Sequence, residues 1–133
     1  MAQENVEIVR RATEAYSRGD LDGTLESWAP NALLDWSNSR GLDAGVVRGR
    51  DEIRRYMARF LELFEEVRIE FEDLTEVKEG VVVADNLARV RGRDGIETQA
   101  RSTWLITIQD GQQTSLTLYQ TRAEALEAAG LRE

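Results

Sequence analysis

In the first half of the chain, apolar residues recur every three or four positions, the spacing of a helix with one buried face. The first such segment runs from about Glu4 to Arg18, and Gly19 follows it as a favourable residue just past a helix end. A second, short helix is predicted after Asp20, whose carboxylate can cap it, and Pro30 is expected to stop it. A third, longer helix is predicted over about Arg50 to Val67.

After the third helix the apolar spacing becomes alternating, which is typical of strands with one buried face. The apolar phase slips before Leu74, and this slip predicts a β-bulge near Glu72 and Asp73. Two Asp-Gly pairs predict hairpin turns. A T-x-x-E capping box beginning at Thr121 predicts a last short helix, which Gly130 should end. The predicted strands are Arg68–Val77, Val81–Gly92, Ile96–Gln109 and Gln112–Gln120.

The remaining segment, between the second and third helices, reads as a short strand from Ala32 to Ser37 and then a loop from Asn38 to Arg48. Helices first and an antiparallel meander last indicate an α+β fold, with the helices on one face of the sheet. The 133 residues suit one domain, 1–133. A long, bulged sheet that curls around the third helix would form a half-open cone, whose apolar mouth is a natural site for a small molecule.

The turn lengths decide which side chains face into this cone. A three-residue loop at 93–95 would set Ala84 opposite Trp104, whereas a two-residue Asp-Gly turn would flip the strand and turn Asp85 and Arg89 inward. We favour the three-residue loop because the inner face is then more apolar.

The same loop type at the second Asp-Gly pair, residues 109–111, would pair Ile108 with Gln112 and set Trp104 opposite Leu116. The side chains then expected inside the cone are mostly aromatic or aliphatic, with a few polar groups. They are Tyr16, Trp28, Trp36, Tyr56, Phe60, Asn86, Ser102, Trp104, Leu116, Leu118 and Gln120. Each aromatic residue also fits a plain core position, whereas the Asn86 amide needs a hydrogen-bond partner, either Ser102 or a ligand.

Composition narrows the available chemistry. Cysteine and histidine are absent, which excludes thiolate nucleophiles, disulfides, histidine-based triads and histidine-ligated metals. Carboxylates, hydroxyls, amides and arginine remain, and we predict neither a metal nor a cofactor. A net charge of −8 argues against nucleic acid as a partner, and no apolar stretch approaches a membrane span. The sequence also shows no targeting signal, and a cytoplasmic location is therefore the expectation.

Five segments resemble the nuclear transport factor 2-like superfamily, and the last of them resembles its polyketide-cyclase-like (SnoaL-like) branch. They are A-Y-S-R-G-D-L-D-G at 15–23, W-A-P-N-A at 28–32, R-G-R-D-E-I at 48–53, W-L-I-T-I-Q-D-G at 104–111 and Y-Q-T-R-A-E-A-L-E-A-A-G-L at 119–131. The resemblance implies a curved sheet, a cone-shaped pocket and frequent homodimers. It does not imply one activity, since the superfamily includes isomerases, cyclases, dehydratases, epoxide hydrolases and binding modules.

The catalytic positions of these relatives are not carried over intact. The base and the two hydrogen-bond donors of the isomerase branch would fall near Trp36, Ala12 and Trp104, with Asp35 and Tyr16 as the nearest substitutes. The cyclase and dehydratase branches depend on a histidine, which this chain lacks. The Asp-Arg-Asp set of the epoxide hydrolases could be mimicked only in part, and only in the strand register that we do not favour.

Three hypotheses follow. The first is a protein that binds a small hydrophobic molecule without acid–base machinery. The second is an isomerase, cyclase or lyase with Asp35 as general base and Tyr16 or Tyr56 as hydrogen-bond donor. Against it, Leu34 and Trp36 should face the cone, which would leave Asp35 solvated on the other side. The third is a dimeric interaction module. A homodimer is expected through an outer sheet patch with few charges, formed by Thr103, Leu105, Thr107, Thr117 and Tyr119.

Overall fold

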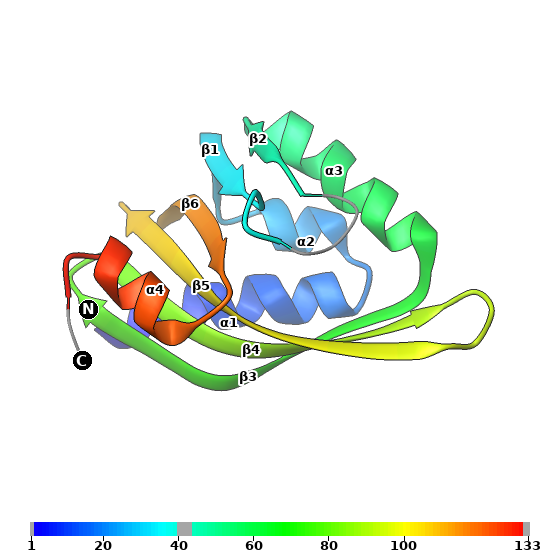
Figure 1. Cartoon of the computed structure of the whole chain (residues 1–133). Helices are drawn as coiled ribbons and strands as arrows, with labels where there is room; N and C mark the ends of the chain where they lie inside the picture. Colours follow the sequence, from blue (N-terminus) through cyan, green and yellow to red (C-terminus); the bar gives the residue numbers. More distant parts are fainter. Residues whose placement is uncertain (1, 40–43, 132–133) are drawn as a thin grey trace.

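Six strands form one curved mixed sheet in the computed structural model, which describes residues 2–39 and 44–131. The strand order is β2-β1-β6-β5-β4-β3. The last four strands form the expected meander, β1 pairs in parallel with β6, and β2 pairs antiparallel with β1 (Figure 1). The strands are β1 (Trp28–Asp35), β2 (Val46–Arg48), β3 (Phe64–Lys78), β4 (Val81–Gly92), β5 (Glu97–Gln109) and β6 (Gln112–Tyr119). The expectation of an α+β fold with a curved sheet is confirmed.

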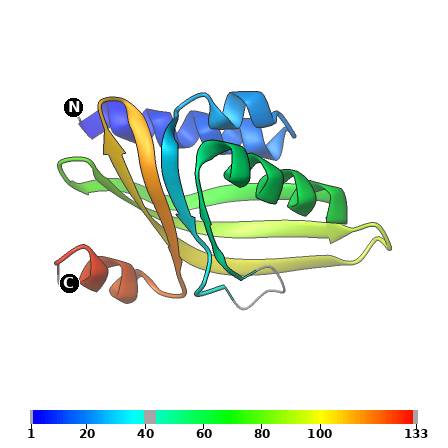
Figure 2. The same ribbon diagram turned by 90° about the horizontal axis from the view of Figure 1, so that it is seen from above.

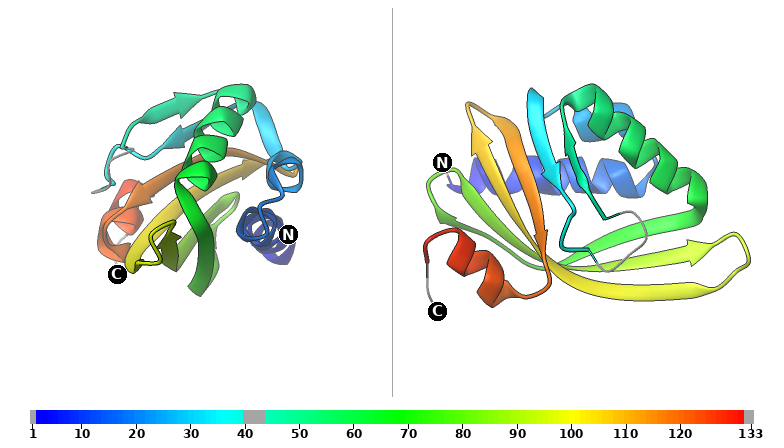
Figure 3. Two further views of the ribbon diagram at one scale, coloured as in Figure 1. Left: turned by 90° about the vertical axis from the view of Figure 1, so that its right-hand side faces the viewer. Right: turned by 45° about the horizontal axis from the view of Figure 1, so that its top comes forward.

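Three helices, α1 (Ala2–Ser17), α2 (Leu21–Leu25) and α3 (Arg50–Leu63), lie along one face of the sheet (Figures 2 and 3). A fourth, α4 (Arg122–Ala128), packs against β4, β5 and β6. The backbone N–H of Ile69 on β3 donates to the Ser17 hydroxyl at the end of α1 (3.1 Å), so a hydrogen bond joins this helix to the sheet. Within the described ranges, no helix has both the length and the apolar character that a membrane crossing requires.

The core fills the space between these helices and the inner sheet face. Trp28 and Ile53 are almost completely buried there, as is Ile106 on β5. Trp36 and Tyr56 pack against this core but stay partly exposed. The core is therefore closed at its centre and bordered by accessible aromatic side chains.

Local signals in the sequence account for several turns and helix ends. Asp20 accepts a hydrogen bond from the N–H of Gly23 and caps α2. Thr121 and Glu124 form the expected capping box at the start of α4. At its end, the N–H of Leu131 donates to the carbonyl of Leu126 (2.8 Å), the long hydrogen bond of a Schellman motif. The pairing of β3 with β4 slips between Phe71 and Asp73, which confirms the predicted bulge.

Several predicted boundaries are wrong because strand pairing overrides local spacing. The strand predicted over Ala32–Ser37 runs from Trp28 to Asp35. The third helix ends at Leu63 rather than Val67, since residues from Phe64 onward already pair with β4. Pro30 does not end a helix but lies inside β1. It is tolerated there because the pairing of β1 with β6 is irregular between Trp28 and Leu33, so its missing N–H breaks no regular ladder. The predicted 38–48 loop contains β2, and its residues 40–43 lie outside the described residues.

The two hairpin registers had different outcomes. Ala84 pairs with Trp104 as predicted, and only Gly95 adopts a positive φ in the loop at 93–95. The second prediction is wrong, because Trp104 pairs with Leu118 rather than Leu116. Asp110 and its following glycine both have positive φ, which is the two-residue type I′ turn, and a bulge after Thr107 shifts the pairing further. The combined shift is two residues, so the same residues of β6 still face inward.

Candidate functional site

Trp104 occupies the centre of an aromatic cluster on the inner sheet face. It comes from β5 and is 6% exposed. Its ring centroid lies 5.9 Å from that of Trp36, which follows β1, and 5.9 Å from that of Phe71 on β3 in an edge-on arrangement. The indole Nε1 of Trp104 is buried without a hydrogen-bond partner. Because an unpaired buried donor costs free energy, this group is a candidate donor to a bound molecule.

Tyr16, on the last turns of α1, and Tyr56, on α3, interact electrostatically. Burial is the larger cause, and the neighbouring Tyr56 the smaller one, of a strong rise in the pKa of Tyr16 above its ordinary value. The Tyr16 phenol therefore stays neutral throughout the physiological pH range. A neutral phenol in an apolar setting is a hydrogen-bond donor rather than a base.

This raised pKa predicts a distinct alkaline titration. The chain has three tyrosines, and the pKa is raised for two of them, Tyr16 and Tyr119. Of these two, Tyr16 should ionise at the higher pH. Ultraviolet absorbance of the phenolate should show a late phase that is missing in Tyr16→Phe. Because Tyr16 ionises near pH 10 in the unfolded chain and only at higher pH in the folded one, the free energy of unfolding should also fall above about pH 10. That fall should be shallower in Tyr16→Phe, and an unchanged titration in that variant would contradict the assignment.

Asn86 is 1% exposed and finds its partner within its own hairpin. Its Nδ2 donates to the backbone carbonyl of Ser102 (3.2 Å) and, less favourably, to that of Ala84 (3.4 Å). The Ser102 hydroxyl lies 3.5 Å from the Asn86 Oδ1. Of the two partners left open by the sequence, Ser102 is therefore the one observed, and Asn86 braces β4 against β5.

The other predicted cone residues divide into core and rim. Trp28, Leu116 and Leu118 belong to the buried core. Phe60 packs on Phe64 with ring centroids 4.9 Å apart, at the end of α3. Gln120 is held at the end of β6, where its Nε2 donates to the carbonyl of Asn38 (2.6 Å). Four of the predicted aromatic residues are partly exposed: Tyr16, Trp36, Tyr56 and Phe60. Phe71 on β3 is partly exposed too. Phe71 is not among the residues that the sequence predicts to face the cone, although alternation places it on one strand face with Ile69.

Asp35 lies on the side of β1 opposite the core residue Leu34. Its Oδ1 accepts hydrogen bonds from the backbone N–H of Ser37 (3.0 Å) and from its hydroxyl (2.6 Å). It also interacts electrostatically with Tyr119. Asp35 thus interacts with Ser37 and Tyr119, whereas Tyr16 interacts with Tyr56 on α3.

The outer face is partly covered. Arg122, the first residue of α4, makes ion pairs with Asp73 (3.1 Å) and Asp85 (2.9 Å). Thr103 donates to Asp85 (2.7 Å) and is 4% exposed. The expectation that Thr103 belongs to an accessible outer patch is therefore wrong, because α4 packs across this part of the sheet.

A separate cleft of about 230 Å³ lies where α2 meets the start of α3. It is lined by charged side chains and one leucine: Asp22, Leu25, Glu26, Arg50, Asp51 and Arg54. None of the predicted cone residues lines it. Its charges already pair in part, since Arg54 contacts Asp22. Among the described residues, no group of three acidic side chains is arranged to hold a metal ion.

Comparison with known proteins places this geometry in a family. The model of the SnoaL-like domain family matches residues 9–116. An NTF2-like protein of unknown function from Burkholderia pseudomallei superposes with a TM-score of 0.77 at 21% identity, over 93% of this chain and 95% of that one. The Δ5-3-ketosteroid isomerase from Mycobacterium sp. gives 0.77 at 15% identity, over 89% and 93%.

A third similar structure contains a bound ligand. It is a Mycobacterium tuberculosis protein in complex with estradiol-17β-hemisuccinate, with a TM-score of 0.78 at 9% identity, over 90% of this chain and 95% of that one. At such identities the likeness is one of fold. The search of curated proteins found no match. The family match spans most of the chain, and the protein therefore belongs to the SnoaL-like domain family.

Proposed function

We propose that the protein binds a small, mostly apolar molecule with at least one acceptor oxygen, held between α1, α3 and the inner sheet face. The observation that carries this proposal is the aromatic cluster of Trp36, Phe71 and Trp104, in which the buried Nε1 of Trp104 has no hydrogen-bond partner. Tyr16, which interacts with Tyr56, adds a neutral hydrogen-bond donor. A permanently protonated donor next to accessible aromatic rings matches a ligand that is apolar over most of its surface and polar at one point.

The partly exposed rim supplies the apolar part of the binding energy. Trp36 and Phe71 contact Trp104, and Tyr56 packs against the same core. Covering such side chains with a ligand removes apolar surface from water, worth about 25 cal/mol per Å² before the cost of association. The complex of the Mycobacterium tuberculosis protein with estradiol-17β-hemisuccinate supports this class of ligand, since that protein shares the fold.

Binding without carboxylate catalysis is favoured over an isomerase that uses Asp35. The carboxylate of Asp35 is tied to Ser37 on the side of β1 away from the core. Any turnover of a β,γ-unsaturated ketone should therefore change less than about threefold in Asp35→Asn. Loss of a general base typically costs about a hundredfold or more, so a loss of that size would restore the enzyme hypothesis.

We also propose a homodimer through the outer sheet face, on the part that α4 leaves accessible. Leu105 and Thr107 on β5 lie beside Thr117 and Tyr119 on β6, and all four are partly exposed. A patch with few charges on an outer face is suited to association. Sedimentation of wild type against Leu105→Arg tests it: the substitution should shift the population toward monomer.

A ligand screen tests the binding proposal itself. The panel holds apolar ketones and phenols, among them estradiol-17β-hemisuccinate. A ligand at a hundred times its dissociation constant should stabilise the protein by about 2.7 kcal/mol, seen as a rise in melting temperature. The rise should shrink in Tyr16→Phe and persist in Tyr119→Phe, the matched tyrosine outside the cone. The absence of stabilisation by any panel member would contradict the proposal.

A further inference from the structure

The first half of β5 is a regular strand exposed on both of its faces. Residues Glu97 to Arg101 pair with β4, yet every one of them is exposed. β6 pairs with residues Thr103 to Gln109 of β5. β6 ends at Tyr119, opposite Thr103, and the chain then continues into α4. Figures 1 and 2 show this end of the β4–β5 hairpin extending past the helices. Among the described residues, β4 is thus the one strand partner of this segment.

The backbone groups along this free edge follow from the loop before it. The N–H of Gly92 donates to the carbonyl of Ile96 (2.9 Å), so Ile96 directs its polar groups toward β4. In an antiparallel ladder successive residues alternate in direction. Glu97, Gln99 and Arg101 therefore direct their N–H and C=O groups away from β4, in position to pair with another strand.

We propose that a second copy of this chain adds to this edge, antiparallel and related by a twofold axis through Gln99. When two copies related by a twofold axis join their strands into one sheet, paired residues have their side chains on the same face. Odd-numbered residues of one copy must therefore pair with odd-numbered residues of the other. With Gln99 on the axis, all five residues are paired, and Glu97 of each copy faces Arg101 of the other. In the next register in either direction, Glu97 no longer faces Arg101 of the other copy, and part of the segment is left unpaired.

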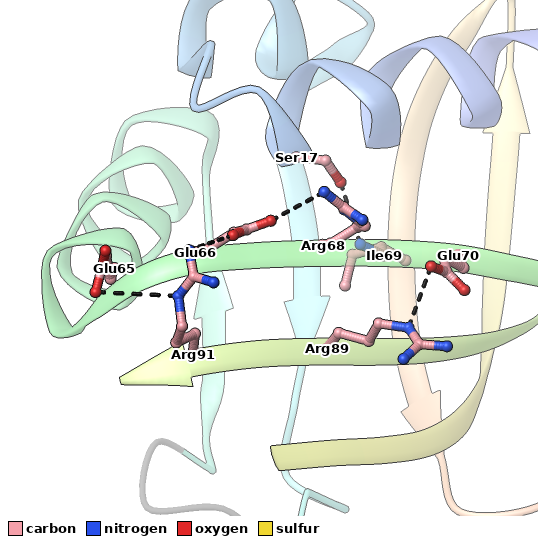
Figure 4. Close-up of polar contacts among 8 residues, drawn as sticks. All are labelled: Ser17, Glu65, Glu66, Arg68, Ile69, Glu70, Arg89 and Arg91. Carbon is pink, nitrogen blue, oxygen red and sulfur yellow. Dashed lines mark hydrogen bonds and ion pairs between the residues drawn. The ribbon is translucent and has the colours of Figure 1, made fainter. Parts of the chain in front are cut away.

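The neighbouring charges leave Glu97 available for this contact. Arg91 lies directly across from Glu97 on β4, but it pairs with Glu66 (2.6 Å), as Figure 4 shows. Arg89 is likewise paired with Glu70 (3.2 Å; Figure 4). Within the described part of the chain, Glu97 makes no ion pair.

Arg101 can serve two partners, because its Nε and Nη2 bond Glu72 and its remaining Nη1 can bond a further carboxylate. Ile96, 63% exposed beside the edge, would lie against the partner's Ser102 in this register. The contact is short, so a weak, reversible dimer is expected. It involves a different part of β5 from the outer-face patch, and it does not depend on the binding function of the cone.

Cysteine cross-linking tests the register directly, since the chain has no native cysteine. Cα atoms of a hydrogen-bonded antiparallel pair lie about 5.5 Å apart, within the range that a disulfide spans. Gln99→Cys should therefore cross-link under mild oxidation. Arg93→Cys, also at an exposed position but in the loop away from the axis, should not cross-link. Thr117→Cys reports on the outer face. Cross-linking of Gln99→Cys no faster than that of Arg93→Cys, or of Thr117→Cys alone, would overturn the proposal.

Charge reversal gives a second, independent readout. In sedimentation at low salt, Glu97→Arg and Arg101→Glu should each weaken self-association by about tenfold or more, because like charges then face each other across the axis. The double variant Glu97→Arg/Arg101→Glu restores opposite charges and should recover most of the affinity. A double variant as weak as the two single variants would overturn the proposed pairing. Circular dichroism checks that each variant keeps its fold.

Discussion

Replacing Trp104 with alanine is expected to lower the free energy of unfolding by about 3–5 kcal/mol. The indole is 6% exposed and contacts two further aromatic rings from β3 and from the end of β1. Removing it leaves a large cavity where the curved sheet meets its core. Part of the loss is offset because the unpaired Nε1 donor is removed too. Urea unfolding followed by circular dichroism measures the change.

Ile96→Ala is the control for this prediction. Ile96 directly precedes β5 and is 63% exposed, so its loss should cost about 0.5 kcal/mol or less. A Trp104→Ala variant within 1 kcal/mol of wild type, on the scale of an ordinary surface change, would show that Trp104 does not hold the sheet and its core together.

The second large effect is expected on ligand affinity. Trp36→Ala should weaken binding of a panel ligand by about 10- to 100-fold, since burying a large apolar side chain against a ligand is worth about 1.5–3 kcal/mol. The fold should tolerate this change better than the loss of Trp104, because Trp36 is already partly exposed. Isothermal titration calorimetry gives the affinity.

Leu105→Ala is the matched control, since Leu105 is partly exposed on the opposite face of the sheet. The Leu105→Ala variant should bind the ligand with the same affinity as wild type. Equal losses in the two variants would indicate a general loosening of the protein rather than a contact between Trp36 and the ligand.

The fold was predictable from the sequence where local chemistry and sheet pattern agree. Alternation located the four meander strands, and the phase slip before Leu74 located the bulge. The Thr121 capping box located α4. The predictions failed where two local readings were both allowed: the Asp110-Gly111 pair fits a two-residue or a three-residue loop, and only the pairing of β5 with β6 decides between them.

The candidate site was less predictable because it depends on contacts between distant segments. Helical spacing places Tyr16 on one helix face and Tyr56 on another, but it does not show that the two side chains interact. It also cannot show that α4 covers Thr103, since that contact depends on Arg122 reaching two aspartates on neighbouring strands. Alternation places Phe71 on one strand face with Ile69, but it does not show the contact between Phe71 and Trp104.

The most direct test of ligand binding in the cone is fluorine NMR of the protein labelled with 5-fluorotryptophan. The three tryptophans give three resonances, each assigned with a tryptophan-to-phenylalanine variant. Trp36 and Trp104 border the proposed site, whereas the backbone carbonyl of Trp28, 2% exposed, accepts from Arg50 of the charged cleft. Titration with a stabilising panel ligand should shift the Trp36 and Trp104 resonances saturably and leave that of Trp28 in place. A shift of the Trp28 resonance alone would locate the ligand at the α2–α3 cleft and contradict binding in the cone.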